Sequence, residues 1–171
     1  MLEYEFLQAK KIDEALNYLD KYNKVKLIAG GTDLLVEMHK DDIDNDKVDY
    51  LLDISNITEM KGIKEKEDKI EIGALVTHSE LVKSELINKN SAVLAQGAVT
   101  IGSTQIRNRG TVGGNVVNAS PAADLLSPLI ALKAEVVLKS VNGTRSLSLP
   151  EFITGPYRTD LTKNEILTKV I

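Results

Sequence analysis

Two short glycine-rich segments constrain the fold of this chain more than any other feature of its sequence. In the first, an apolar run over residues 25–29 leads directly into Gly30 and Gly31. In the second, residues 100–115 hold four of the chain's 11 glycines among Ser, Thr, Asn and Gln. Glycine allows positive φ and close approach of the backbone to another group. Both segments are therefore predicted to be tight polar turns beside a binding surface.

The first segment has the pattern of a buried strand that enters a helix through a tight turn. We expect a helical turn over residues 34–38, with Thr32 and Asp33 as suitable N-cap residues. The free N–H groups at such a turn favour a bound anion. The segment is neither a Walker A loop nor a Rossmann fingerprint, because the required spacings are absent. Taken alone, it is explained equally well by a plain strand-to-helix turn.

The second segment combines exposed backbone with short polar side chains, which predicts many hydrogen-bond donors and little bulk. Four side chains able to contact ribose hydroxyls lie in or after it: Asn115, Asn118, Ser120 and Asp124. An Asp is a suitable acceptor for a ribose diol. In the alternative interpretation, Arg107 and Arg109 hold the loop through surface salt bridges, and Asp124 caps a helix that begins near Leu125. For Asp124 both interpretations stay open.

The first part of the chain is predicted to be a small α/β lobe. Residues 11–21 place apolar side chains at helical spacing, and three short apolar runs are typical of strands. The runs cover residues 4–7, 25–29 and 50–54. We therefore predict a first lobe over residues 1–55.

The remainder of the chain mixes hairpins and helices. Hairpins are predicted where residues 63–65 meet 70–72 and where 135–139 meet 144–147, the second across Asn142-Gly143. Thr77 and Glu80 form a capping-box pattern at a helix start. A small, apolar, buried helix is expected over 91–99 and another helix over 123–132. The sequence thus indicates an α+β protein with a second lobe over residues 56–171.

Composition excludes several classes of function. With 43% hydrophobic residues among 171, the chain can bury a core, and its net charge of −4 without a basic cluster argues against nucleic-acid binding. It contains no cysteine, hence no thiolate nucleophile and no Cys-ligated metal. The resulting absence of disulfides suits the cytoplasm. The N-terminus lacks a signal-peptide pattern, and no apolar stretch is long enough to span a bilayer.

No catalytic or metal-binding residue is predicted. His39 and His78 lack an acid–base or nucleophile partner, so we expect His39 to be solvated and His78 to be structural. The acidic residues 41–47 resemble the start of a calcium loop, but Lys47 stands where glycine is needed, and a solvated loop is the prediction. We expect Tyr157, in a Gly-Pro-Tyr-Arg turn, to pack on the core rather than contact a ligand.

Taken together, these motifs resemble the FAD-binding subunit of the molybdenum hydroxylases, a family that includes xanthine dehydrogenase, aerobic carbon monoxide dehydrogenase and nicotinate dehydrogenase. The resemblance covers essentially the whole chain. It is carried by Ala29–Leu34, Gln105–Asn108, Thr111–Asn115, Ala119–Pro121 and Asp124, in that order. It implies the two-lobed FAD-binding fold shared with the vanillyl-alcohol oxidase group, with FAD extended between the lobes.

The resemblance also implies a set of cofactor-binding residues. Residues 29–34 would wrap the diphosphate, residues 111–115 would meet the diphosphate and ribityl region, and Asp124 would contact the adenosine end. Ile101 matches a position near the flavin that is aromatic in some members, and Leu167 matches a further contact. The full set is Ala29, Gly30, Gly31, Thr32, Asp33, Leu34, Ile101, Thr111, Gly113, Gly114, Asn115, Asp124 and Leu167.

In this family the subunit would pass electrons from iron–sulfur clusters of a partner chain through FAD to NAD or another acceptor. Hydroxylation would occur on a separate molybdenum cofactor subunit. Family members continue for roughly another hundred residues as a compact C-terminal domain, whereas this sequence ends at Ile171. We therefore expect weaker FAD retention and turnover by this chain alone. The alternatives are a stand-alone flavin oxidoreductase and a non-catalytic binding or assembly domain of the same fold.

Overall fold

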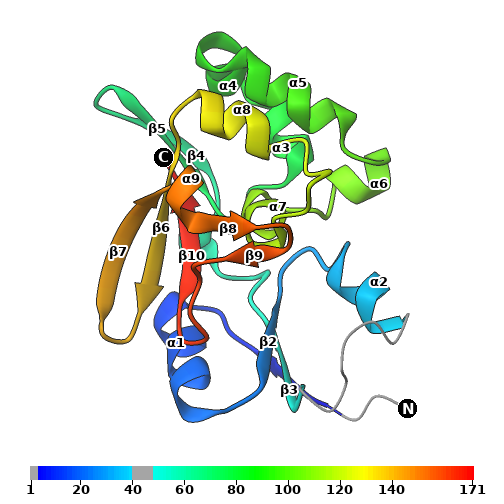
Figure 1. The fold of residues 1–171 in the computed structure, drawn as a ribbon, viewed down its shortest axis with the longest axis vertical. Coiled ribbons are helices and arrows are strands. Elements are labelled where there is room, and N and C mark those ends of the chain that lie inside the picture. The colour runs from blue at the N-terminus through cyan, green and yellow to red at the C-terminus, as the bar shows by residue number, and fades with distance from the viewer. Residues whose placement is uncertain (1–3, 40–47) are drawn as a thin grey trace.

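The computed structural model describes residues 4–39 and 48–171. The acidic segment 41–47, and with it the calcium-loop comparison, lies outside the described residues. Within the described ranges the chain forms a small parallel sheet, a larger antiparallel sheet and a group of helices packed beside the larger sheet (Figure 1). This arrangement confirms the predicted α+β class.

The parallel sheet has the strand order β1-β3-β2. β3 pairs in parallel with both β1 and β2. Helix α1 makes the first crossover and buries Ala15, Leu16 and Leu19, which confirms its predicted helical spacing. The elements of this part are β1 (Glu5–Gln8), α1 (Ile12–Lys21), β2 (Val25–Ile28), α2 (Leu34–His39) and β3 (Tyr50–Asp53).

The antiparallel sheet has the strand order β4-β5-β10-β6-β7. Both predicted hairpins are confirmed as β4–β5 and β6–β7. The C-terminal strand β10 inserts between them and pairs with β5 and β6. The strands of this sheet are β4 (Ile63–Lys66), β5 (Lys69–Gly73), β6 (Glu135–Ser140), β7 (Gly143–Ser148) and β10 (Ile166–Val170). A separate two-stranded hairpin consists of β8 (Ile153–Gly155) and β9 (Arg158–Thr159).

Short helices fill the space beside the antiparallel sheet (Figure 1). Thr77 and Glu80 form the predicted capping box at the start of α3. Helix α5 confirms the helix predicted over 91–99, but it buries only one face, because Val93 and Val99 are exposed. The elements are a 3-10 helix (Thr58–Met60), α3 (His78–Lys83), α4 (Glu85–Asn90), α5 (Ala92–Thr100), α6 (Thr104–Arg107), α7 (Val112–Asn118), α8 (Leu126–Ala131) and α9 (Leu149–Phe152).

One hydrophobic core runs through both sheets. It joins Leu16 and Leu52 of the parallel part to Leu138 and Phe152 of the antiparallel part. The parallel sheet ends before residue 55 and the antiparallel sheet begins after it. This supports the two lobes that we propose, 1–55 and 56–171, and the shared core holds them against each other.

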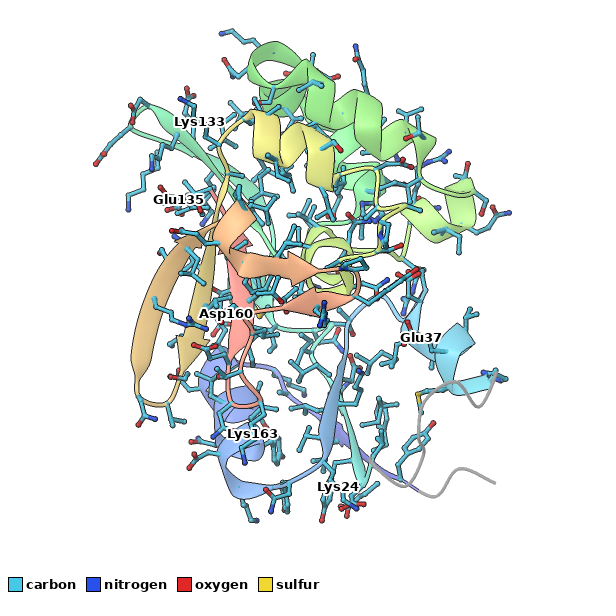
Figure 2. The ribbon with its side chains drawn as sticks, viewed as in Figure 1. Lys24, Glu37, Lys133, Glu135, Asp160 and Lys163 are labelled. Carbon is cyan, nitrogen blue, oxygen red and sulfur yellow. The ribbon has the colours of Figure 1, made fainter. Side chains whose placement is uncertain are left out.

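An ion-pair network around Arg145 fixes the connection between β9 and β10. Arg145 on β7 donates to both carboxylate oxygens of Glu165 at 2.7 and 2.8 Å and to the Asp160 carboxylate at 2.7 Å. Asp160 lies in this connection (Figure 2). Hydrogen bonding from Arg145 lowers the pKa of Glu165 to about 2, and the same contacts raise the pKa of Arg145. The network closes residues 160–165 onto the sheet.

We predict that Arg145→Met lowers stability at neutral pH by about 1–2 kcal/mol, a modest value because the Arg145 side chain is 38% exposed. The pKa of Glu165 is depressed in the folded state, so its contribution is complete above its ordinary pKa and is lost as the pH falls toward 2. The variant should therefore show a flatter loss of stability over that acid range, measured by urea unfolding at several pH values.

Lys139→Met is the matched control, because it removes an ion pair with Asp13, whose side chain is 81% exposed. We expect it to change stability little. Equal effects of the two substitutions would contradict a special role for the Arg145 network.

Candidate functional site

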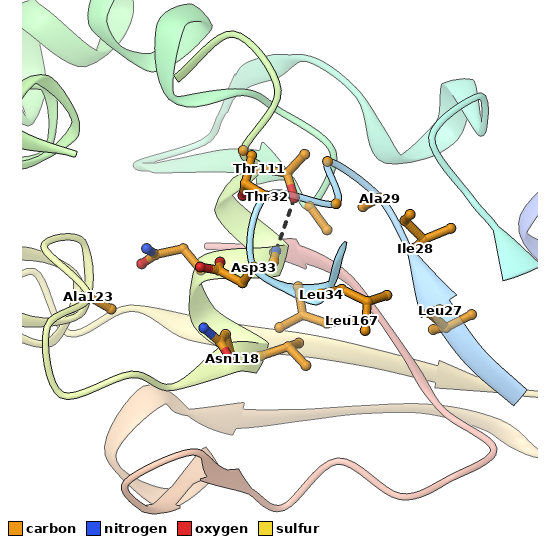
Figure 3. A pocket seen from close by; sticks show the side chains of 18 of the residues that line it. Leu27, Ile28, Ala29, Thr32, Asp33, Leu34, Thr111, Asn118, Ala123 and Leu167 are labelled. Carbon is orange, nitrogen blue, oxygen red and sulfur yellow. Dashed lines mark hydrogen bonds between the residues drawn. The ribbon is translucent and has the colours of Figure 1, made fainter. Parts of the chain in front are cut away.

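A cavity of about 650 Å³ opens between the parallel part and the antiparallel part of the molecule. Figure 3 shows side chains from three separate segments around it, including Leu34, Asn118 and Leu167. Every residue predicted to bind the cofactor lines this one cavity: Ala29, Gly30, Gly31, Thr32, Asp33, Leu34, Ile101, Thr111, Gly113, Gly114, Asn115, Asp124 and Leu167. The structure thus brings together residues separated by up to 138 positions, 167 − 29, in the sequence.

The two glycine-rich segments touch directly. A Cβ atom added to Gly30 would overlap the carbonyl oxygen of Arg109. Gly31 has φ +74°, a conformation that side chains other than glycine rarely adopt. One glycine therefore permits the contact between the segments, and the next permits the turn into α2.

The first segment presents unused backbone donors. Two of its carbonyl groups are engaged, since Gly31 O accepts from Leu35 N at 3.1 Å and Asp33 O accepts from Glu37 N at 3.0 Å. The N–H groups of residues 30–34 donate to no residue within the described ranges. Backbone N–H groups without a protein partner suit an anionic ligand.

The second segment differs from the predicted polar turn with exposed backbone. Residues 112–118 form helix α7, and Thr111 caps it by accepting from Gly114 N at 3.1 Å (Figure 3). Val112 N donates to Val76 O and Gly113 N donates to Ala74 O, both at 2.8 Å. The prediction of exposed backbone donors in the second segment is therefore wrong for residues 112–114, because their N–H groups already donate within the protein.

The adjacent glycines of α7 have different surroundings. A Cβ on Gly113 would lie 2.7 Å from the Ala74 Cβ and 2.8 Å from the Ala74 carbonyl oxygen, so Gly113 allows α7 to pack against the end of β5. Gly114 is exposed, and a Cβ there would meet only the Thr111 hydroxyl, at 3.0 Å. Of the two, Gly114 is the one that leaves room for a ligand.

Asn115 has an unmet hydrogen-bonding atom beside the cavity. Its side-chain oxygen is buried and has no partner within the described part of the chain. Buried polar atoms in folded proteins are almost always paired. An amide oxygen accepts hydrogen bonds, so in this position, within α7 and on the same cavity as residues 30–34, it fits a ligand that carries donor groups such as hydroxyls.

His78 is buried next to the cavity at 3% exposure, and its Nδ1 atom has no partner among the described residues. Burial, and then the positive charge of Arg107, lower the pKa of His78 to about 4. The imidazole is therefore neutral at pH 7. Its ring packs on Gly110, where an added Cβ would lie 2.9 Å from it, in agreement with the predicted structural role.

The alternatives proposed for the charged residues of the second segment are wrong. Helix α8 begins at Leu126 with Leu125 as N-cap and no side-chain cap, so Asp124 is not a helix cap. The Asp124 carboxylate is exposed and pairs with no described residue. Arg107 holds the loop through the carbonyl oxygens of Ile101 and Gly102 at 2.9 and 3.0 Å, and not through salt bridges.

Several residues of the cavity wall carry no sequence signal. Leu27, Leu161 and Ile166 line the apolar part, and they come from two strands and a connection that only the fold brings together. Tyr157 also lines the cavity and is 63% exposed, so the prediction that it packs on the core is wrong. Tyr157 lies in the turn between β8 and β9, and the pairing of these strands belongs to the tertiary structure. Its position near Ser120 could therefore not be inferred from the sequence.

Comparison with known proteins identifies the class of this site. The sequence profile described as "FAD binding domain in molybdopterin dehydrogenase" matches residues 2–171, and the chain belongs to this family. FAD is therefore its cofactor, and the resemblance inferred from the motifs is confirmed. Among the described residues, no helix is long and apolar enough to cross a membrane.

The chain is similar to the nicotinate dehydrogenase FAD-subunit of Eubacterium barkeri, at 39% identity over all of this chain and 58% of that protein. It is 32% identical to the glyceraldehyde dehydrogenase medium chain of Sulfolobus acidocaldarius over 98% of this chain and 59% of that one. A carbon monoxide dehydrogenase chain from Hydrogenophaga pseudoflava superposes with a TM-score of 0.93 at 32% identity, covering 98% and 58% respectively. The chain thus spans somewhat more than half the length of these relatives.

Replacement by Val is predicted to have a different effect at each of the two glycines of α7. Gly114→Val should abolish or strongly weaken FAD binding while the fold persists, because the new side chain enters the cavity. Gly113→Val should instead destabilise the protein by about 1–3 kcal/mol through overpacking against Ala74.

Flavin fluorescence titration measures the first effect and the melting temperature of the apoprotein the second. Wild-type affinity in Gly114→Val, or a wild-type melting temperature in Gly113→Val, would contradict this division between the two glycines.

Proposed function

We propose that the cavity between the lobes holds FAD in an extended form, with the diphosphate at residues 30–34. One observation carries this placement: the N–H groups of residues 30–34 have no partner within the described ranges, and these residues line the same cavity as Gly114 and Asn115 of α7. Its volume of about 650 Å³ is in the usual range for cofactor sites. The remaining predicted residues would contact the sugar chains and rings, with Asp124 at a ribose.

We further propose that the chain is the FAD-binding electron-transfer component of a multi-subunit molybdenum hydroxylase. Bound FAD would accept electrons from iron–sulfur clusters on a partner subunit and deliver them to NAD or another acceptor, while a molybdenum cofactor subunit carries out hydroxylation. The similarity to FAD subunits and medium chains of such enzymes supports this assignment. A cytoplasmic location stays a prediction.

This chain's own contribution would be binding and orientation of the flavin. Its buried histidine has a pKa of about 4 and is unsuited to proton transfer at neutral pH. No cysteine is present as a nucleophile. Acid–base and hydroxylation chemistry are thus assigned to other subunits of the complex.

Affinity purification from the native host tests the proposed function. A yellow preparation with flavin absorbance that co-purifies with iron–sulfur and molybdenum-containing subunits is the expected result. Flavin without these partners would favour a stand-alone flavin oxidoreductase. A colourless protein that ignores added FAD would favour a binding or assembly domain.

Asp124→Ala tests the adenosine end of the proposed site. The carboxylate has no partner within the described residues, so its removal should leave the melting temperature unchanged. If it accepts a ribose hydroxyl, FAD affinity should fall by about 1–2 kcal/mol. Isothermal titration measures this loss, with Asp20→Ala on the exposed side of α1 as the control. A lowered melting temperature with normal affinity would overturn the assignment.

A further inference from the structure

Tyr157 is the one Tyr, Phe or Trp among the described residues that line the cavity. It is 63% exposed, although large aromatic side chains are normally buried for the area they remove from water. The aromatic pairs found within the described ranges involve Tyr18, Tyr22 and Tyr50, not Tyr157. Packing in the core therefore does not account for this side chain.

The backbone of Tyr157 is held in an unfavourable conformation. Its φ is +55°, which costs free energy for any residue with a Cβ. The neighbouring Gly155 has φ +157°, and the Arg158 guanidinium lies so close that a Cβ on Gly155 would be 2.9 Å from it. Residues kept in such conformations are concentrated where a fixed geometry serves binding or catalysis.

Two contacts fix Tyr157 against the end of α7. Its N–H group donates to the Ala119 carbonyl oxygen at 2.9 Å, and its hydroxyl accepts from Ser120 Oγ at 3.3 Å. Ala119 itself is left-handed, at φ 47°, and closes α7. The turn between β8 and β9 is thus tied to the same helix that carries Gly114 and Asn115 into the cavity.

The ring of Tyr157 lies at the rim of the cavity. It lines both the main cavity and a smaller adjoining groove, whose other walls include Thr32, Asp33 and Asn118. These residues belong to the segment with free N–H groups and to α7. Because Tyr157 is 63% exposed and lines both hollows, its ring is accessible to a ligand that extends along the cavity.

We propose that Tyr157 is a ligand-contacting residue that stacks on an aromatic ring of the bound dinucleotide. This inference rests on the proposed placement of FAD in the cavity. Because the ring is fixed before the ligand arrives, stacking requires little additional ordering of the side chain. FAD carries two rings of the required chemistry, the isoalloxazine and the adenine, and the test separates them.

FAD affinity of the full chain is measured for wild type, Tyr157→Phe, Tyr157→Leu and Tyr157→Gly. Tyr157→Phe should bind like wild type, whereas Tyr157→Leu should bind about three- to ten-fold more weakly, the range for one aromatic pair. Tyr157→Gly should also bind weakly but keep or raise the melting temperature of the apoprotein, because glycine relieves the positive φ. Phe6→Leu is the control, since Phe6 is 58% exposed on β1 and does not line the cavity.

Titrations with FMN and ADP then identify the ring. A loss in Tyr157→Leu that appears with FMN places Tyr157 on the isoalloxazine, and a loss that appears with ADP places it on the adenine. Unchanged affinity for all three ligands in Tyr157→Leu, while Gly114→Val loses FAD, would overturn the role of Tyr157 and leave the cofactor placement intact. Normal FAD binding in both variants would overturn the placement itself.

Discussion

The contact between the backbone at Gly30 and the carbonyl group of Arg109 holds the two halves of the site together. Any side chain at residue 30 would overlap that carbonyl group, so the two segments would have to separate. With them in contact, residues 30–34, whose N–H groups have no partner in the described part of the chain, line a single cavity together with Gly114 and Asn115 of α7. The hydrophobic core is continuous between the two parts of the molecule, so the fold itself holds the two segments in contact.

The two segments provide different chemistry to the cavity. The first offers backbone donors, while the second has used its amides at residues 112–114 to join α7 to the end of β5. The second segment therefore acts mainly through its surface and side chains, at Gly114 and Asn115. Similar glycine-rich sequences can thus serve ligand binding in one place and close packing in another, depending on where each N–H group points.

Sequence reasoning recovered most of the local structure. Helix α1, the hairpins β4–β5 and β6–β7, and the capping box at Thr77 follow from side-chain periodicity and turn chemistry, which act over a few residues. The residues that the family resemblance implied as cofactor contacts also all line one cavity in the structure. The predictions failed where the outcome depended on a distant neighbour: for the amides of α7, for the alternative roles of Asp124 as a helix cap and of Arg107 in salt bridges, and for the packing of Tyr157.

The sequence by itself determined the family, the α+β class and the two segments around which the site is built, because glycine spacing and apolar periodicity are local properties. Only the tertiary structure decided which backbone groups remain free. β10 completes the antiparallel sheet from the far end of the chain, and Val76 and Ala74 accept the hydrogen bonds of α7 from another segment. A donor is available to a ligand only when no acceptor lies nearby, and the acceptors that settle this are remote in sequence.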